Sequence, residues 1–190
     1  MKNNYTYLLF IVCLIACVKE KRASNQVLDY NDKDFQLQKG VLLYNDKPFT
    51  GTLLSFDAIN DTYNRLEYFG GKKDGEELKK YKNGVIAEQR FYKQGNKVGK
   101  HSAWWKNGTI KFEYHFNQKG EYNGTVKEWY RNGQPLKIFN FKNGREEGSQ
   151  KMWQSDGKIR ANFVTKKGER FGLIGLKKCY SVNTKNEDFN

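Results

Sequence analysis

Residues 99–144 read GKHSAWWKNGTIKFEYHFNQKGEYNGTVKEWYRNGQPLKIFNFKNG, and glycine recurs within them at a regular spacing. The spacing continues on both sides of this stretch. Glycines open units of 24 or 25 residues at Gly51, Gly75, Gly99, Gly124 and Gly148, and Gly172 closes the last unit. Self-similarity at a fixed period indicates a stacked array of small structural units rather than one closed core.

A second glycine inside each of the last four units predicts how a unit folds. Asn or Asp always precedes it: Asn83-Gly84, Asn107-Gly108, Asn132-Gly133 and Asp156-Gly157. Such a dipeptide between two apolar-patterned runs predicts a β-hairpin with a type I′ turn, in which both central residues have positive φ. A third glycine precedes the following unit, at Gly95, Gly120, Gly144 and Gly168.

The residues after each turn alternate as a strand does, as in Ile110, Phe112, Tyr114 and Phe116. This alternation predicts that one side of each strand is buried and the other is exposed to solvent. A helical interpretation fails because glycine interrupts these runs too often. The sequence therefore predicts an all-β fold, an elongated antiparallel sheet of about five tandem hairpins. We expect the array, with a C-terminal cap, to occupy residues 40–180.

The start of the array is expected to be irregular, as terminal repeats commonly are. The unit that opens at Gly51 has Asn60 where the turn glycine would stand. Upstream, Val41 to Tyr44 and Lys47 to Thr50 predict one more half unit that starts the sheet. Pro135 removes a ladder donor, but it is expected at the first position of a strand, where that loss is tolerated.

The pattern of glycines, turns and aromatic residues resembles the MORN repeat family in its bacterial variant form. The segments Gly99 to Gly120 and Gly124 to Gly144 carry the resemblance, which extends over roughly Gly40 to Gly172. Proteins that look like this include the YwqK-type group described as antitoxins, and eukaryotic relatives are linked to membranes, phosphoinositides and scaffolding. The resemblance implies a long sheet surface used for contact rather than for a reaction.

The N-terminus predicts export and a lipid anchor. Lys2 precedes an apolar stretch from Tyr5 to Ile15, which is too short for a spanning helix of about 20 residues and is typical of a signal peptide. Leu14-Ile15-Ala16-Cys17 resembles a bacterial lipobox. We expect a signal peptide over residues 1–16, a lipid on Cys17, a polar tether over residues 17–39 and a place at a bacterial envelope membrane, periplasmic or surface facing. The alternative is an uncleaved anchor segment.

The chain is basic, with a net charge of +13 and an isoelectric point near 9.5. Basic residues between aromatic ones are typical of single-strand nucleic-acid binders. An exported lipoprotein does not meet cytoplasmic nucleic acid, so this partner is excluded by compartment. The charge either faces anionic lipid or acidic envelope polymers, or it keeps sheet edges soluble and apart.

Signals for catalysis, cofactors and metals are poor. The two histidines, His101 and His115, occupy different positions of adjacent units, and each is expected on the sheet surface. Nucleophile-elbow, zinc-protease and phosphate-loop motifs are missing from the sequence. Cys179 lies where the repeat pattern ends, before a polar tail over residues 181–190. It is expected to be buried in a closing cap, and the alternative is a reactive thiol.

Recognition, if it uses aromatic platforms, is expected at the rings that precede the turns. These candidate binding residues are Trp104, Trp105, Trp129, Trp153, Tyr81 and Tyr130. The first functional hypothesis is a lipid-anchored, non-enzymatic interaction or scaffold protein, antitoxin-like or immunity-like, that binds a protein. The second is binding of anionic lipid or envelope polysaccharide through the aromatic and basic sheet face.

Overall fold

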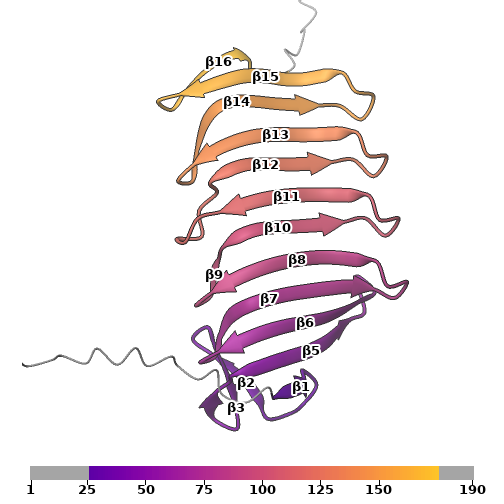
Figure 1. Ribbon diagram of the computed structural model, residues 1–190, viewed down its shortest axis with the longest axis vertical. Helices are drawn as coiled ribbons and strands as arrows, with labels where there is room; N and C mark the ends of the chain where they lie inside the picture. The colour runs from indigo at the N-terminus through magenta and orange to yellow at the C-terminus, as the bar shows by residue number, and fades with distance from the viewer. Residues whose placement is uncertain (1–25, 176–190) are drawn as a thin grey trace, which may run out of the picture.

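Hydrogen-bonded strands stack in one layer along the whole length of the molecule (Figure 1). The computed structural model describes residues 26–175. The main sheet has 13 strands in the order β1-β5-β6-β7-β8-β10-β11-β12-β13-β14-β15-β16, with β9 paired to β8. A second sheet, of three strands, has the order β2-β3-β4. The strands are β1 (Val27–Asp29), β2 (Phe35–Gln38), β3 (Val41–Tyr44), β4 (Lys47–Pro48), β5 (Gly51–Asp57), β6 (Thr62–Phe69), β7 (Lys72–Tyr81), β8 (Ile86–Lys93), β9 (Asn96–Lys97), β10 (Gly99–Trp104), β11 (Ile110–Phe116), β12 (Gly124–Trp129), β13 (Pro135–Lys142), β14 (Arg145–Trp153), β15 (Ile159–Lys166) and β16 (Glu169–Leu173).

The predicted fold class is confirmed. Five hairpins follow one another, β5/β6, β7/β8, β10/β11, β12/β13 and β14/β15, and each pair is antiparallel. The one parallel pair joins β1 to β5. Pro135 does begin its strand, as the sequence predicted.

The turns at the Asn-Gly and Asp-Gly positions are not type I′. At the first of them only Gly84 has positive φ, at 85°, and Asn83 does not. The amide of Gly84 donates to the carbonyl of Tyr81 at 2.9 Å, and the amide of Tyr81 donates to Val85 at 2.9 Å. This is a three-residue loop, a type I turn followed by a left-handed glycine. The same pair of bonds closes the loops at Gly108, Gly133 and Gly157.

Two-residue turns with positive φ at both residues do occur, at the opposite edge of the sheet. They use the third glycine of the unit, at Gln94-Gly95, Asn143-Gly144 and Lys167-Gly168. The type I′ turn was therefore predicted at the wrong place: turns with positive φ at both residues contain the third glycine of the unit, not the second. The dipeptide fits both turn types, and the number of residues between the strands decides which one forms.

The Asn residues of the turns at Gly84 and Gly108 link their units to the next one. The Oδ1 of Asn83 accepts from the amide of Val85 at 3.2 Å, and its Nδ2 donates to the carbonyl of Lys106 in the next turn at 3.1 Å. Asn107 repeats both contacts, with Arg131 as the second partner. Asp156 in the last turn accepts from Lys158, and it has no amide to donate. Asp is thus found where the described chain has no further turn of this kind.

The N-terminal end of the array is closed by the small sheet. Leu42, Phe49 and Leu53 form a buried cluster there, with Leu28, Phe35, Tyr44 and Tyr68 packed against it. Val41–Tyr44 and Lys47–Pro48 belong to this separate sheet, so the expected half unit of the main sheet is wrong. Main-chain bonds divert the chain: the amide of Leu42 donates to Gly71 at 2.8 Å, and that of Gly71 to Phe49 at 2.7 Å. Strands β1 and β2 also fall inside the segment expected to be a tether.

We predict that Asn83→Asp lowers the free energy of unfolding by about 1 kcal/mol, the usual net value of one hydrogen bond. The carboxylate keeps the contact to the amide of Val85 but loses the donor to Lys106. Denaturant unfolding measures the change. The matched control, Asp156→Asn, should be close to neutral because that turn has no successor among residues 26–175. Equal effects of the two substitutions would contradict the link between turns.

Candidate binding surface

The six predicted aromatic residues all lie at one edge of the sheet, where β7, β10, β12 and β14 enter the three-residue turns (right side of Figure 1). A register shift recurs at this edge, directly before Lys80, Trp104, Trp129 and Trp153. All six rings are half-buried. The structure therefore places the six rings in one row along this edge, which we call the turn edge. Neighbouring residues partly cover each of them.

Several of these rings connect adjacent units. The hydroxyl of Tyr81 donates to the carbonyl of Trp104 at 3.1 Å, and that of Tyr130 donates to Trp153 at 3.0 Å. Burial raises the pKa of Tyr81 above its ordinary value. Trp105 replaces tyrosine in the intervening unit, and its indole Nε1 is buried without a hydrogen-bond partner among the described residues. The Lys111 ammonium lies 4.7 Å from the Trp105 ring centroid.

Most of the exposed apolar side chains near the turn edge lie in the first hairpin, although Ile159 of the last hairpin, opposite Trp153, is also 48% exposed. Leu54, Phe56 and Tyr63 are 39%, 44% and 57% exposed, and we call them the turn-edge patch. The rings of Phe56 and Tyr63 are 5.0 Å apart, and the Lys82 ammonium lies 5.1 Å from the Phe56 centroid. A solvent-exposed group of rings next to cations is a common feature of protein contact surfaces.

Asp61 holds two cations beside this patch. Its carboxylate lies 2.8 Å from the Nζ of Lys82 and 3.4 Å from that of Lys106. The hydrogen bond from Lys82 is the main reason why the pKa of Asp61 is lowered. Arg131 occupies the equivalent place in the next turn, and it has no salt bridge within residues 26–175. The turn edge thus presents one basic side chain in each of the three middle units, and two of the three are partly neutralised.

The face that carries the alternating residues after each turn is packed with its own side chains. We call it the ring face, and its buried members include Tyr92, Phe112, Val126 and Phe163. Arg90 lies 2.9 Å from Glu88, and the guanidinium also approaches the Phe112 ring at 5.8 Å. Packed rings and paired charges thus occupy this face together, as expected for a buried side, although Arg90 Nε is buried without a hydrogen-bond partner among the described residues.

Two tyrosines of the ring face show how much water this packing excludes. Burial, together with the nearby Glu77 carboxylate, raises the pKa of Tyr92 to about 12. Burial also raises the pKa of Tyr114, whose hydroxyl donates to Glu128 at 2.7 Å. Lys137 pairs with the same carboxylate. Both phenols are protonated donors at neutral pH, so neither is a poised base.

The third position of every unit is buried, and sequence reasoning missed this. Its occupants are Leu53, Glu77, His101, Val126 and Gln150. The expectation that His101 is a surface residue is wrong, since it is 2% exposed. The other histidine, His115, is half-buried, and its Nδ1 lies 3.0 Å from the carbonyl of Thr125.

His101 and Gln150 replace missing main-chain partners at the places where one hairpin joins the next. The Nε2 of His101 lies 2.8 Å from the carbonyl oxygen and 3.1 Å from the amide nitrogen of Phe91. Gln150 does both tasks at once for Asn140, donating to its carbonyl at 2.9 Å and accepting from its amide at 3.0 Å. Buried backbone groups need such partners. The signal that could have identified these residues is their shared distance from the unit glycine.

Within residues 26–175, His, Cys, Asp and Glu form no group of three that could hold a metal ion. In that same range the chain has no helix with the length and apolarity to cross a membrane. Cys17 and Cys179 lie outside the described residues, so the expected lipid site and buried thiol stay predictions.

Stacked hairpins that share one type of turn define a repeat protein, in which each unit contacts only its neighbours along the array. Two segments, residues 73–94 and 122–143, match the family model described as "MORN repeat variant". These two segments are therefore MORN-variant repeats, and each contains one three-residue turn with residues of its two flanking strands. Such all-β arrays serve in binding or scaffolding and are typically non-catalytic. A search of curated proteins found no match to the chain.

We predict that His101 makes folding sensitive to mild acid. Burial holds the pKa of His101 below its ordinary value, so the unfolded chain binds the proton more readily. The contribution of neutral His101 to the free energy of unfolding is fully present above about pH 6.5, the pKa of histidine in the unfolded chain. It is lost as the pH falls toward the lower pKa of the folded state. In His101→Gln the free energy of unfolding should fall less between pH 7.5 and 5.5 than in the wild type.

Glutamine is the matched replacement because Gln150 does the same work in another unit. Both proteins retain His115, so the comparison isolates the change at position 101. Parallel pH profiles of the two proteins would show that His101 is not the group responsible.

Proposed function

We propose that this protein is a non-enzymatic interaction or scaffold protein of the bacterial envelope, held at a membrane by a lipid on Cys17. Its array binds another protein through the turn edge. The main support is the turn-edge patch, where Leu54, Phe56 and Tyr63 stay exposed although the rings of the opposite face are packed. Uncovered apolar groups beside polar ones favour a protein contact. An antitoxin-like or immunity-like role is the version of this proposal that the bacterial resemblance favours.

The test is capture from native membranes with three versions of the full chain. Wild type and Leu37→Ser should capture the same protein, and the double variant Phe56→Ser, Tyr63→Ser should lose it. Leu37 is a matched control because it is 74% exposed and lies in the small sheet. All three positions tolerate polar residues in the fold because they are surface positions.

Capture of the same protein by all three versions, or of none, would count against the turn edge as a protein site. The second candidate, an anionic lipid or polysaccharide, is favoured by the row of Lys82, Lys106 and Arg131. The three versions should then bind anionic vesicles or acidic polysaccharide alike, and binding should weaken as salt is raised. Binding that is unaffected by salt would argue against that electrostatic contact.

The lipid anchor has its own test. Cells that express the full chain and are fed a labelled lipid precursor should incorporate label into the wild type and not into Cys17→Ser. Cys13→Ser is the matched control, since it lies within the expected signal peptide and should leave labelling unchanged. Equal labelling of all three proteins would exclude Cys17 as the lipid site.

A further inference from the structure

The three-residue turns at Asn83, Asn107 and Asn132 each contain an Asn-Gly pair. In such a pair the side-chain amide can be lost without an enzyme. The glycine main-chain nitrogen attacks the asparagine Cγ, a C–N bond forms, and Nδ2 leaves as ammonia with the proton of the glycine amide. Water then opens the succinimide ring to aspartate or isoaspartate. Glycine favours the attack because it has no side chain and the widest backbone freedom.

The surroundings in the sequence make these three sites chemically alike. A basic residue precedes each asparagine and glycine follows it, in Lys82-Asn83-Gly84, Lys106-Asn107-Gly108 and Arg131-Asn132-Gly133. In all three turns Oδ1 of the asparagine accepts from the amide two residues on, at 3.1 or 3.2 Å. This bond turns the side chain toward the main chain that follows it, and it stabilises negative charge on the oxygen during the attack.

The leaving amide is held in two of the three turns and not in the third. Nδ2 of Asn83 donates to the carbonyl of Lys106 at 3.1 Å, and that of Asn107 donates to the carbonyl of Arg131 at 3.4 Å. Nδ2 of Asn132 makes no hydrogen bond within residues 26–175, and the residue is exposed. A hydrogen bond to the departing group stabilises the reactant, so Asn132 lacks a restraint that the other two have.

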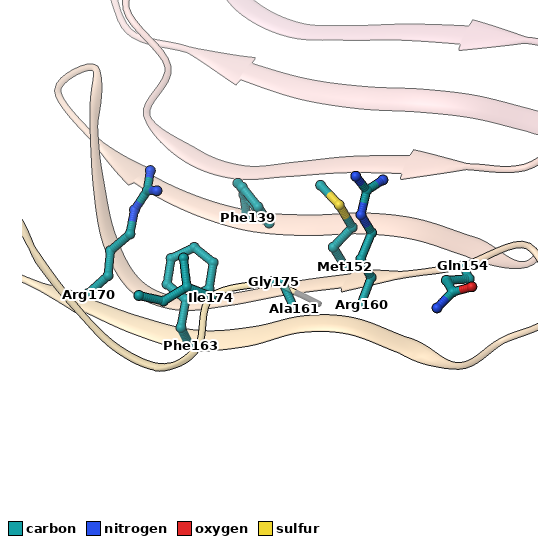
Figure 2. Close-up of a pocket in the computed structure, with 9 residues that line it drawn as sticks. All are labelled: Phe139, Met152, Gln154, Arg160, Ala161, Phe163, Arg170, Ile174 and Gly175. Carbon is teal, nitrogen blue, oxygen red and sulfur yellow. The ribbon is translucent and has the colours of Figure 1, made fainter. Parts of the chain in front are cut away.

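The turn after Asn132 also lies where the array has few neighbours. It begins at Gln154, and Figure 2 shows this side chain at one end of an open hollow. Only β15 and the exposed β16 follow it in the described sheet. Fewer contacts make local opening easier. Opening frees the nitrogen of Gly133, whose amide donates to the carbonyl of Tyr130 at 2.9 Å.

The remaining Asn-Gly pairs, at Asn123 and Asn143, lie toward the opposite edge of the sheet and are held differently. Oδ1 of Asn123 accepts from the amide of Asn143 at 3.2 Å, and Oδ1 of Asn143 accepts from Nδ2 of Asn117 at 3.4 Å. Neither oxygen accepts from the amide two residues on. These two side chains are therefore not turned toward the glycine that would attack them.

We propose that Asn132-Gly133 is a site of spontaneous deamidation and the first turn at which the folded protein ages. The aspartate product places a carboxylate next to Arg131, which has no salt bridge within residues 26–175, and so lowers the positive charge of the turn edge. The isoaspartate product adds a methylene to the main chain of a loop that two hydrogen bonds close between Tyr130 and Gly133 or Gln134. The reaction needs no partner and no membrane, so it is independent of the proposed function.

Peptide mapping by mass spectrometry tests the proposal. The full chain is kept folded at mildly alkaline pH, which favours attack by the glycine nitrogen, and the aspartate and isoaspartate formed at each turn are followed over time. Asn132 should lose its amide at least about fivefold faster than Asn83 or Asn107, the rate ratio that corresponds to one hydrogen bond. In urea, where the turns are unfolded, the three rates should converge because the local sequences are alike.

Asp156→Asn is the matched variant, because it puts an asparagine into another turn that lacks a link. Position 156 accepts from the amide of Lys158 at 3.0 Å, and residues 26–175 contain no later turn of this kind. The amide introduced at position 156 should be lost about as fast as that of Asn132. Loss as slow as at Asn83 would contradict the role of the contact to the leaving amide.

Equal rates at the three turns of the folded chain would overturn the proposal, because they would assign the reaction to unfolding of the whole array. A faster reaction at Asn83 or Asn107 would overturn it as well. So would an excess at Asn132 that persists in urea, since the local sequence and not the fold would then select the site.

Discussion

Side-by-side attachment of hairpins is the constraint on which the structure depends. A two-stranded hairpin is at best marginally stable in water, so each unit needs the main-chain bonds of its neighbours. Side chains add to that ladder where it is weakest. Asn83 reaches the carbonyl of Lys106, Tyr81 reaches that of Trp104, and Gln150 replaces absent main-chain partners of Asn140. Stability in such an array is a sum of contacts between neighbours.

This constraint makes the two ends of the molecule chemically different. The first hairpin is covered by the small sheet, where Leu42 and Phe49 are almost fully buried. The last described strand, β16, is exposed along its whole length. A terminal unit lacks one neighbour, so it must be capped or left with a reactive edge. The exposed end is therefore the part of the sheet where further contacts matter most.

The candidate surface was only partly predictable. Spacing placed Trp104, Trp129 and Trp153 at equivalent positions, and the structure does align them at one edge. The sequence could not tell whether those rings stand free, because exposure depends on the neighbouring unit. His101 illustrates the opposite error. A histidine found in a single unit resembles a surface residue, yet its position makes it the partner of the Phe91 main chain.

The sequence by itself determined the repeat, the number of hairpins and the side of each strand that is buried. These follow from local rules, namely the turn dipeptides, the glycine spacing and the alternation of apolar residues. The tertiary structure decided the turn type, the fate of Val41 to Pro48 and the partners of His101 and Gln150. The turn type depends on how many residues the paired strands leave between them. The other two depend on how one unit meets another through main-chain atoms, and such contacts leave no periodic trace in the residue types.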